Sequence, residues 1–517
     1  RNLEDILLQA DKVLALSPAG EPAVRAQMGR SAALLARAQG ADAMAALEAA
    51  QAALRHEHVL DLHVDLACMR ASQLLQGQGN EQTVMALDEL LANPALSPHQ
   101  RGRLQGRRSG ALRVLGQLAE AELSLDLALE AFGDEPSLEL GNLLDVRSRN
   151  AMSRGDFKAV LEHARRAVDV MHRAGHPASA VAPQTMCGVA LMSMGQLDEA
   201  LAQLQPARAL AHQHGLVSAE RGAILNMVAV LLAQGQAHEA LQCLEQGFAL
   251  SPHFRGAGEE QAFLEARYQC RVVVGELGAA LDLRPELVAR SRRIEEVARR
   301  HSGLLVATDL PLLIGHPELV AADLASVLHD LTALGAGYLA PQALAKAAWM
   351  ALEQSQGQLA LQHSSAAMVL HCEGPEQHAL RSAFHAAALA TQGRRDEARA
   401  ALQIDAQGAG AEVAALVLAV GLRVYTDGGE VPAQWQAQAQ AAAQDPQVPL
   451  INRLHLLDAL AATADASAST GGPDWHRIGA PVARQLHASL ASHADCQAHF
   501  ERRYRRWLGA TVTAAQD

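Results

Sequence analysis

The side chains best suited to metal chemistry in this sequence are its 23 histidines and six cysteines. His56, His58 and His63 lie close together, beside Asp61 and Asp65. On a helix, His56 and His63 would share one face, whereas His58 would point elsewhere. Tetrahedral zinc needs four convergent ligands, usually in more closely spaced pairs. We therefore interpret these histidines as surface or loop residues, and we predict no metal and no cofactor.

Sequence patterns of nucleotide-binding and catalytic sites are missing. The chain contains no G-x-x-x-x-G-K-S/T, no H-E-x-x-H and no G-x-S-x-G, and its short glycine clusters do not follow a strand. The six cysteines are scattered without a C-x-x-C pair, which indicates buried free thiols in a reducing cytoplasm. We predict that the chain is not an enzyme. A minor alternative is an active site within residues 284–344.

Arginine supplies almost all of the positive charge and gathers in two places. Between Arg290 and Arg300, arginines surround Glu295 and Glu296, which predicts a solvated helix face crossed by ion pairs. Near the end of the chain, four arginines flank two aromatic residues, which predicts a capping helix with arginines reaching toward solvent. This terminal cluster comprises Arg502, Arg503, Tyr504, Arg505, Arg506 and Trp507.

The overall charge limits the classes of partner. A net charge of −13 and a pI near 6.0 argue against electrostatic attraction to nucleic acid or anionic membranes. No run of about 20 apolar residues could span a bilayer. We therefore expect a cytoplasmic protein that binds neither nucleic acid nor membrane. The scarcity of lysine suggests a bacterial source.

The composition indicates the elements that carry these side chains. Half of the residues are hydrophobic but only 3% are aromatic, and alanine and leucine supply most of the apolar content. Both are strong helix formers, while residues that favour strands are sparse. At 517 residues, the chain is also longer than a single hydrophobic core usually supports. These properties predict an all-α chain with several domains or one elongated repeat.

A glycine recurs along the chain at intervals of 36 to 42 residues, about 39 on average. It stands at Gly40, Gly79, Gly116, Gly155, Gly195, Gly235, Gly275, Gly315, Gly357, Gly393 and Gly429. Small residues recur around it. Alanine follows five residues later at Ala45, Ala200 and Ala240, and a small residue precedes it by seven, as at Gly188. Such spacing predicts close antiparallel helix pairs, with the glycine in a left-handed conformation where the first helix ends.

This pattern resembles the tetratricopeptide repeat, because it combines the glycine, the small residues and a closing proline, as at Pro94, Pro252 and Pro446. The usual period is 34 residues, and the longer period here is similar to the sensor domain of the maltose-regulon activator and related bacterial regulators. This resemblance implies a right-handed superhelical solenoid of antiparallel helix hairpins. It also implies that one side of each first helix lines a concave groove for ligands.

The repeats divide the chain into three regions. Residues 1–18 are expected to form the second helix of an incomplete repeat, which implies an upstream domain of the same protein. Residues 19–447 hold about eleven repeats, weakest at 284–344, where Pro285 and Pro311 are expected to interrupt the helices. Residues 448–517 are expected to form a helical cap with a loop at 463–473.

Positions 13, 10, 6 and 3 residues before each glycine share one side of the first helix and should line the groove. In the first four units this side is polar and basic, and in the next three it is largely apolar. Our candidate ligand-binding residues are Arg30, Arg37, Gln73, Arg103, Arg113, Asn142, Asp145 and Arg149. Clustered guanidinium groups suit carboxylates or phosphates, so we predict an acidic peptide or protein partner, or a small anionic effector.

These observations favour a non-catalytic binding or ligand-sensing module that serves as the regulatory arm of a larger bacterial signalling or transcription-regulating protein. A free-standing adaptor for protein complexes is the alternative. It would need a complete N-terminal cap, which the half-repeat at Leu3–Ser17 argues against.

Overall fold

The computed structural model describes residues 3–37, 39–54, 59–74, 79–250, 257–334, 338–372, 374–402, 409–426, 430–467 and 474–509. Throughout these ranges the chain is helical and contains no strand. The all-α, tetratricopeptide-like fold predicted from the repeats is confirmed. None of the described helices combines the length and the apolar character needed to cross a membrane.

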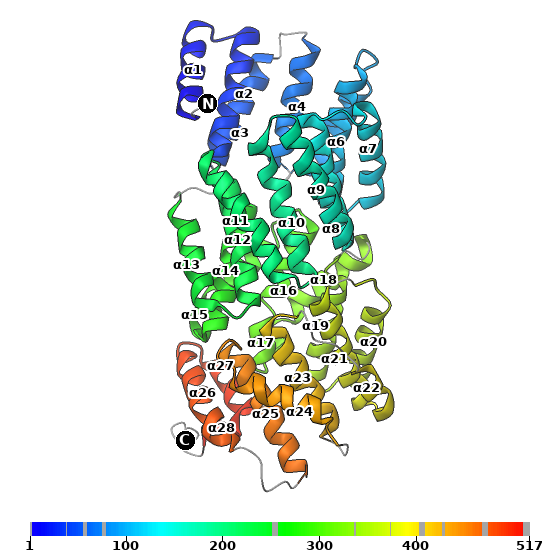
Figure 1. Cartoon of the computed structure of the whole chain (residues 1–517), viewed down its shortest axis with the longest axis vertical. Helices are drawn as coiled ribbons and strands as arrows, with labels where there is room; N and C mark the ends of the chain where they lie inside the picture. The colour runs from blue at the N-terminus through cyan, green and yellow to red at the C-terminus, as the bar shows by residue number, and fades with distance from the viewer. Residues whose placement is uncertain are drawn as a thin grey trace.

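Successive helices pair as antiparallel hairpins, and the hairpins stack into an elongated superhelix with the two ends of the chain at opposite poles (Figure 1). The first helices of the hairpins are α2 (Gly20–Ala36), α4 (Leu60–Leu74), α6 (Pro98–Val114), α8 (Leu138–Arg154), α10 (Val181–Ser193), α12 (Val217–Ala233), α14 (Ala257–Val274), α16 (Val297–Val306) with α17 (Asp309–Leu313), α19 (Ala340–Glu353), α21 (Pro375–Thr391), α23 (Ala411–Tyr425) and α25 (Leu450–Ser467).

The second helices follow them. They are α3 (Gly40–Leu54), α5 (Asn80–Leu91), α7 (Leu118–Phe132), α9 (Phe157–Arg173), α11 (Leu197–Gln213), α13 (Ala237–Ala249), α15 (Leu277–Ser291), α18 (Ala321–Leu334), α20 (Gly357–Met368), α22 (Arg395–Ala401), α24 (Ala433–Gln444) and α26 (Trp475–Ser489). Helix α1 (Leu3–Leu16) packs against α2, and α27 (Ala494–Arg503) and α28 (Arg505–Leu508) follow α26. Short 3-10 turns η1 (Pro177–Ala180) and η2 (Pro317–Leu319) precede α10 and α18.

A residue with left-handed backbone closes most of the first helices. The recurring glycine has this conformation, with φ from +74° to +96°, at Gly79, Gly116, Gly155, Gly195, Gly235, Gly275, Gly315 and Gly393. At Gly195, the turn is fixed by two backbone hydrogen bonds, from Gly195 N to Met192 O and from Gln196 N to Leu191 O, both 2.9 Å. This pattern satisfies carbonyls that the helix end leaves without partners. The predicted role of the glycine is confirmed at these positions except Gly79, which directly precedes α5 and is its N-cap residue.

The predicted register is wrong by two residues in two units, because Gly40 and Gly357 begin a second helix rather than end a first one. In the later unit, Ser355 takes the left-handed conformation, with φ +58°. In the earlier unit, Ala43 is buried where Ala45 was expected, and Ala45 is exposed. Gly429 lies outside the described residues.

Small residues allow the two helices of a hairpin to touch. Ala200 on α11 and Ala240 on α13 are fully buried, as predicted. A Cβ placed on Gly188 of α10 would lie 2.5 Å from Leu204 Cγ on α11, closer than any van der Waals contact. The spacing between paired helices therefore depends on the absence of larger side chains at these positions.

The weak stretch 284–344 departs from the repeat in one helix only. Pro285 lies inside α15, which is continuous, so the predicted interruption there is wrong. Proline removes one backbone hydrogen bond, but Leu281 and Leu287 on either side are buried in the main hydrophobic core and hold the helix in place. The next first helix is indeed broken: α16 ends at Val306, and Pro311 lies in the separate short helix α17.

The C-terminal region differs from the expected cap in two ways. Helix α25 extends to Ser467, so the loop predicted at 463–473 is wrong for residues 463–467, and residues 468–473 lie outside the described ranges. Arg503 does not extend into solvent. It donates to both carboxylate oxygens of Glu353, at 2.5 and 3.0 Å, while the Tyr504 hydroxyl donates to Leu313 O at 2.9 Å.

Successive turns of the superhelix lie directly against each other. Arg113 at the end of α6 forms an ion pair with Glu296, 183 positions later in the chain. The backbone N–H of Tyr338 donates to Ser153 O, 3.3 Å away. A Cβ on Gly235 would lie 2.5 Å from Gln447 Cβ. These contacts join the N-terminal and middle hairpins, and then the middle and C-terminal hairpins, along the long axis (Figure 1).

Replacement of Ala240 by phenylalanine is expected to lower the free energy of unfolding by ~1–3 kcal/mol, because the ring has no space between α12 and α13. Chemical denaturation of the whole chain would measure the change. The matched control is Ala202→Phe, at an exposed position on α11, with an expected effect within ~0.5 kcal/mol. An equal effect of the two substitutions would contradict the packing described above.

Candidate functional site

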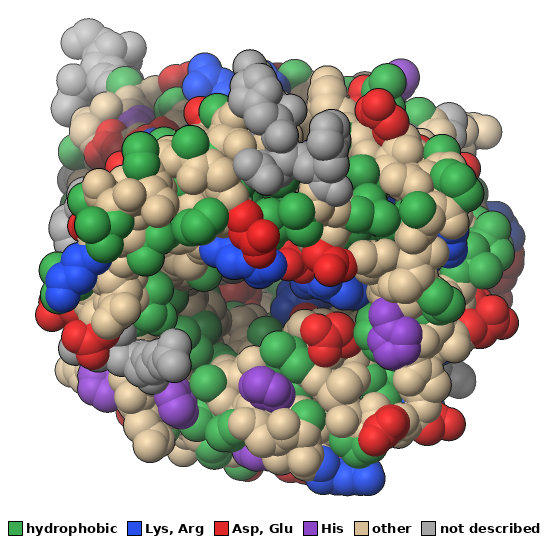
Figure 2. Space-filling model, turned by 90° about the horizontal axis from the view of Figure 1, so that it is seen from above, with side chains coloured by type: hydrophobic (Ala, Val, Ile, Leu, Met, Phe, Trp, Pro, Cys, Tyr) green, Lys and Arg blue, Asp and Glu red, His purple; other side chains and the backbone are tan. Residues whose placement is uncertain are grey.

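The first helices line the interior of the superhelix, where side-chain hydrogen bonds join neighbouring first helices. From above, the molecule is hollowed along its long axis, and basic, acidic and hydrophobic side chains meet at the edge of the hollow (Figure 2). The hydrogen bonds between neighbouring first helices run from Gln73 Nε2 to Ser31 Oγ (2.7 Å), from Arg103 Nη1 to Asp65 Oδ1 (2.7 Å) and from Asn150 Nδ2 to Ser109 Oγ (3.2 Å). The predicted residues Gln73 and Arg103 therefore lie on this inner side.

Arg113 binds a carboxylate from the next turn of the superhelix. Its Nη1 lies 2.8 Å from Glu296 Oε1, and both side chains are largely buried. Burial alone would raise the pKa of Glu296. The nearby guanidinium groups of Arg113 and Arg299 outweigh burial and lower that pKa to about 2, with a further contribution from Arg149. Glu296 is therefore ionised at neutral pH and neutralises the basic side of the groove.

The neighbouring residue, Glu295, binds the start of helix α5. Its carboxylate accepts the backbone N–H groups of Gly79 (2.7 Å) and Asn80 (3.0 Å) and the Asn80 side-chain amide (2.7 Å). Free N–H groups and the helix dipole favour an anion at this end of a helix. The predicted solvated helix face around Glu295 and Glu296 is thus wrong, since both residues precede α16 and bind the first turn of the superhelix.

Arg149 lies beside this contact on α8. Its Nε donates to Asp145 Oδ2 at 2.9 Å, four residues earlier on the same helix. The Asp145 carboxylate is the largest influence on Arg149 and raises its pKa. The charge of Glu296 acts in the same direction. Arg113 thus binds Glu296 directly, while Arg149 binds Asp145 and acts on Glu296 through its charge.

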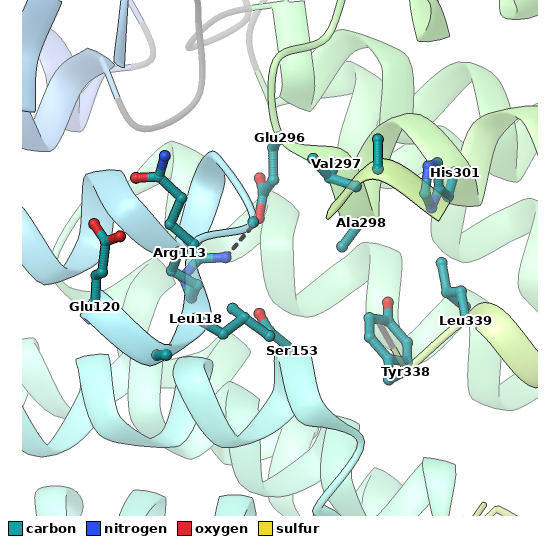
Figure 3. A pocket seen from close by; sticks show the side chains of 14 residues that line it. Arg113, Leu118, Glu120, Ser153, Glu296, Val297, Ala298, His301, Tyr338 and Leu339 are labelled. Atoms are coloured by element: carbon teal, nitrogen blue, oxygen red, sulfur yellow. Dashed lines mark hydrogen bonds and ion pairs between the residues drawn. The ribbon is translucent and has the colours of Figure 1, made fainter. Parts of the chain in front are cut away.

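A cleft of about 520 Å³ opens beside the Arg113–Glu296 pair, between the first turn of the superhelix and the next (Figure 3). One wall comes from the end of α6, the start of α7 and Ser153, and the other from α16 and the segment before α19. The polar groups that face it include Arg113, Glu296, His301 and Tyr338. Leu118, Val297, Ala298, Ala333 and Leu339 are among its apolar lining residues. The cleft can therefore receive a ligand with both charged and apolar groups.

Other predicted residues do not join this cleft. Arg30 Nη1 pairs with Asp11 on α1 at 2.6 Å. The pair spans a first helix and the second helix before it, as does the Arg108–Asp88 pair. The predicted register of the Gly40 unit is wrong by two residues. Arg30 therefore lies on the side of α2 that faces α1. Arg37 is exposed after α2, and Asn142 is half-buried on α8, and neither lines the cleft.

A second cavity of about 340 Å³ lies on the inner side of α19, α21, α23 and α25. Its walls include the stacked rings of Trp349 and Phe384, whose centroids are 5.2 Å apart, together with Arg423 and the buried His455. Our sequence prediction did not include these residues. The same spacing rule could have found part of the site, because Trp349 and Leu352 stand six and three residues before the left-handed Ser355.

The histidines first considered for metal binding do not converge among the described residues. His56 and His58 lie outside those residues, Asp65 is paired with Arg103, and burial raises the pKa of the Cys68 thiol. A group suited to a metal ion forms instead from His316, Glu318 and His499, whose ligand atoms lie within 4.8 Å of one another. Sequence spacing could not reveal it, because His499 follows His316 by 183 positions.

No protein-family model and no curated protein matches the chain. Among solved structures, a Rap protein in complex with competence and sporulation factor is 15% identical, with a TM-score of 0.47, and the match covers 67% of this chain and 97% of that one. A human IFIT1 dimer with m7Gppp-AAAA is 14% identical, with a TM-score of 0.45 and coverage of 86% and 95%. The aspartyl phosphate phosphatase F of Bacillus subtilis is 14% identical, with a TM-score of 0.38 and coverage of 68% and 94%. Likeness of this degree carries no argument about function.

The Arg113–Glu296 contact predicts a pH-dependent contribution to stability. Because the pKa of Glu296 in the folded chain is about 2, below its ordinary value of 4.5, its contribution is complete above pH 4.5 and is lost as the pH falls toward 2. Glu296→Gln should lower the free energy of unfolding by ~2–3 kcal/mol at pH 7 and by about 1 kcal/mol at pH 3. Urea denaturation at both pH values measures this difference. Glu120→Gln, at an exposed residue of the same cleft, is the control, and a loss of equal size at both pH values would contradict the assignment.

Proposed function

We propose that this chain is a non-catalytic binding module that takes an acidic segment of a peptide or protein partner in the cleft beside Arg113. We further propose that it is the regulatory arm of a larger bacterial signalling or transcription-regulating protein, of the long-repeat kind found in the maltose-regulon activator. One observation supports the choice of ligand. The first turn of the superhelix already binds two consecutive glutamates of its own chain, Glu295 through the start of α5 and Glu296 through Arg113.

The chemistry of these contacts suits an acidic peptide. Guanidinium groups and helix N-termini form charge-assisted hydrogen bonds with carboxylates, which are stronger than those between neutral groups. Glu296, Asp145 and Asp65 neutralise Arg113, Arg149 and Arg103 within the chain. A partner carboxylate in the cleft would replace Glu296, so that the largely buried Arg113 keeps a counter-charge. The apolar wall of the cleft would cover side chains next to the exchanged carboxylate.

Binding can be measured by fluorescence anisotropy with a labelled peptide rich in glutamate and a matched peptide in which glutamine replaces glutamate. We expect the acidic peptide to bind more tightly. The Arg113→Ala variant, which removes the cationic side chain of the cleft, should bind the acidic peptide more weakly by ~1.5–3 kcal/mol, roughly a 10- to 150-fold weaker Kd. Arg166→Ala is the control, because that arginine, on α9, forms an exposed pair with Asp134 in the turn after α7.

Equal affinity of Arg113→Ala and the wild type would rule out the cleft as the site. Equal binding of a polyadenylate oligonucleotide in place of the acidic peptide would overturn the proposal that the segment does not bind nucleic acid. The regulatory role is tested by the natural gene. An ATPase, kinase, cyclase or DNA-binding domain encoded in the same reading frame would support it, and a gene that encodes the helical repeats alone would favour the free-standing adaptor.

A further inference from the structure

The cavity of about 340 Å³ beside Trp349 and Phe384 is large enough for a small organic molecule. Four consecutive first helices, α19, α21, α23 and α25, supply its walls, in the half of the superhelix that holds the C-terminus (Figure 1). It shares no lining residue with the cleft beside Arg113. The inner side of the repeats therefore offers a second, separate place for a ligand.

Most of the cavity wall is apolar, and small residues leave the space open. The rings of Trp349 and Phe384 stack with their planes 19° from parallel. The indole N–H of Trp349 donates to Glu353 Oε1 at 3.0 Å, so it needs no partner from a ligand. Ala387 and Ala390 of α21 line the cavity and are partly exposed, so a longer side chain at either position would fill it. This wall suits an apolar body of about the size of one or two rings.

Arg423 supplies a positive charge to the same wall. Its Nη2 donates to Asp458 Oδ2 at 3.2 Å, which is the one hydrogen bond from this guanidinium group to a described residue. The Arg423 side chain is 36% exposed, whereas that of Arg503, which is bound by Glu353, is only 11% exposed. Because a guanidinium group carries several N–H donors, most of those on Arg423 remain for a ligand.

The carboxylates around Arg423 are already bound by other arginines. Arg503 binds both oxygens of Glu353. Asp458, the partner of Arg423, is shared with Arg506, whose Nε lies 3.7 Å from Asp458 Oδ1. Burial and then the positive charge of Arg503 lower the pKa of Arg423, so a further anion beside it would stabilise its charged form.

His455 adds an uncharged polar group to the cavity. Burial and then the charges of Arg423 and Arg503 lower the pKa of this imidazole well below 6.5, so the ring is neutral at pH 7. Its Nδ1 lies 3.3 Å from the Tyr504 hydroxyl oxygen, while Nε2 has no hydrogen-bond partner among the described residues. The His455 ring lines the cavity, so this nitrogen is available to a ligand.

We propose that this cavity binds a small monocarboxylate with an apolar, ring-sized body. The two oxygens of a carboxylate match the N–H groups on one edge of the Arg423 guanidinium, and the body would lie against Trp349 and Phe384. A phosphate dianion fits less well, because Asp458 and Glu353 lie near the same arginine and would repel a second negative charge.

The size of the ligand is limited by the Arg503–Glu353 pair. Glu353 forms part of the cavity wall, and Arg503 holds both of its oxygens. Widening the cavity for a peptide would break this pair and leave a buried charge without its partner. The proposed ligand is therefore a small molecule, and its site is independent of the peptide cleft beside Arg113.

The test is ligand-observed NMR of the full chain with benzoate, phenylacetate, indole-3-acetate and hexanoate, each compared with its uncharged amide. Calorimetric titration then measures the Kd of those that bind. We expect one equivalent of at least one carboxylate to bind with a Kd of about 1 mM or tighter, and its amide to bind roughly tenfold more weakly or less. Phenyl phosphate, a dianion at slightly alkaline pH, should bind more weakly than phenylacetate.

Two variants assign the binding to this cavity by separate routes. Arg423→Gln should weaken carboxylate binding by roughly tenfold or more and leave the binding of the amide unchanged, because only the charged contact is lost. Ala387→Leu should weaken the binding of both compounds, because the added side chain fills the apolar space. The matched control is Arg395→Gln, at an exposed arginine of α22, which should change neither.

Arg113→Ala separates this site from the peptide cleft and should leave carboxylate binding unchanged. Asp458 keeps Arg506 as a partner in Arg423→Gln, so that variant should stay folded, and a thermal unfolding scan checks this. The proposal would be overturned if none of the carboxylates bound, or if an amide or phenyl phosphate bound as tightly as the matching carboxylate. Unchanged affinity in Ala387→Leu, or loss of binding in Arg113→Ala, would also overturn it.

Discussion

Direct contact between successive turns of the superhelix is the constraint on which the other features depend. At Gly235, the backbone has φ +76° and the Cα hydrogen faces Gln447 of the next turn, where a Cβ would lie 2.5 Å from the neighbouring Cβ. At Gly155, a Cβ would lie 3.1 Å from Tyr338 Cβ. The glycine thus does two things at once: it ends the first helix in a left-handed turn, and it lets the following turn of the superhelix approach.

This close approach explains the character of the candidate site. A widely wound superhelix would leave its basic first helices open to solvent along a continuous groove. Here the segment before α16 lies against α5 and α6 and brings Glu295 and Glu296 onto Gly79 and Arg113. A buried guanidinium without a counter-charge is costly, and the carboxylate from the next turn removes that cost. The chain's own side chains consequently line distinct cavities in the interior, including the cleft beside Arg113 and the cavity beside Trp349.

The sequence predicted local features far better than contacts between turns. The left-handed glycines and the buried Ala200 and Ala240 follow from hairpin geometry, which repeats every 39 residues or so. The register failed at Gly357 because Ser355, a residue that rarely adopts positive φ, takes the turn. The Arg113–Glu296 pair could not be predicted, since the number of hairpins in one superhelical turn depends on a small rotation per repeat that no single motif encodes.

The C-terminal end shows how such a stack can be closed and why ligand access differs between its two cavities. Arg503 binds both oxygens of Glu353, and the nearby Tyr504 and Trp507 are buried, so α27 and α28 cover the inner side of the last hairpins. The cavity beside Trp349 and Phe384 lies next to this bidentate ion pair, and opening it further would leave Glu353 without its partner. The cleft beside Arg113 is bounded instead by the segment ahead of α16, whose Glu295 and Glu296 bind the first turn of the superhelix. In the proposed exchange, a partner carboxylate would take the place of Glu296, so Arg113 would keep a counter-charge when this segment moves.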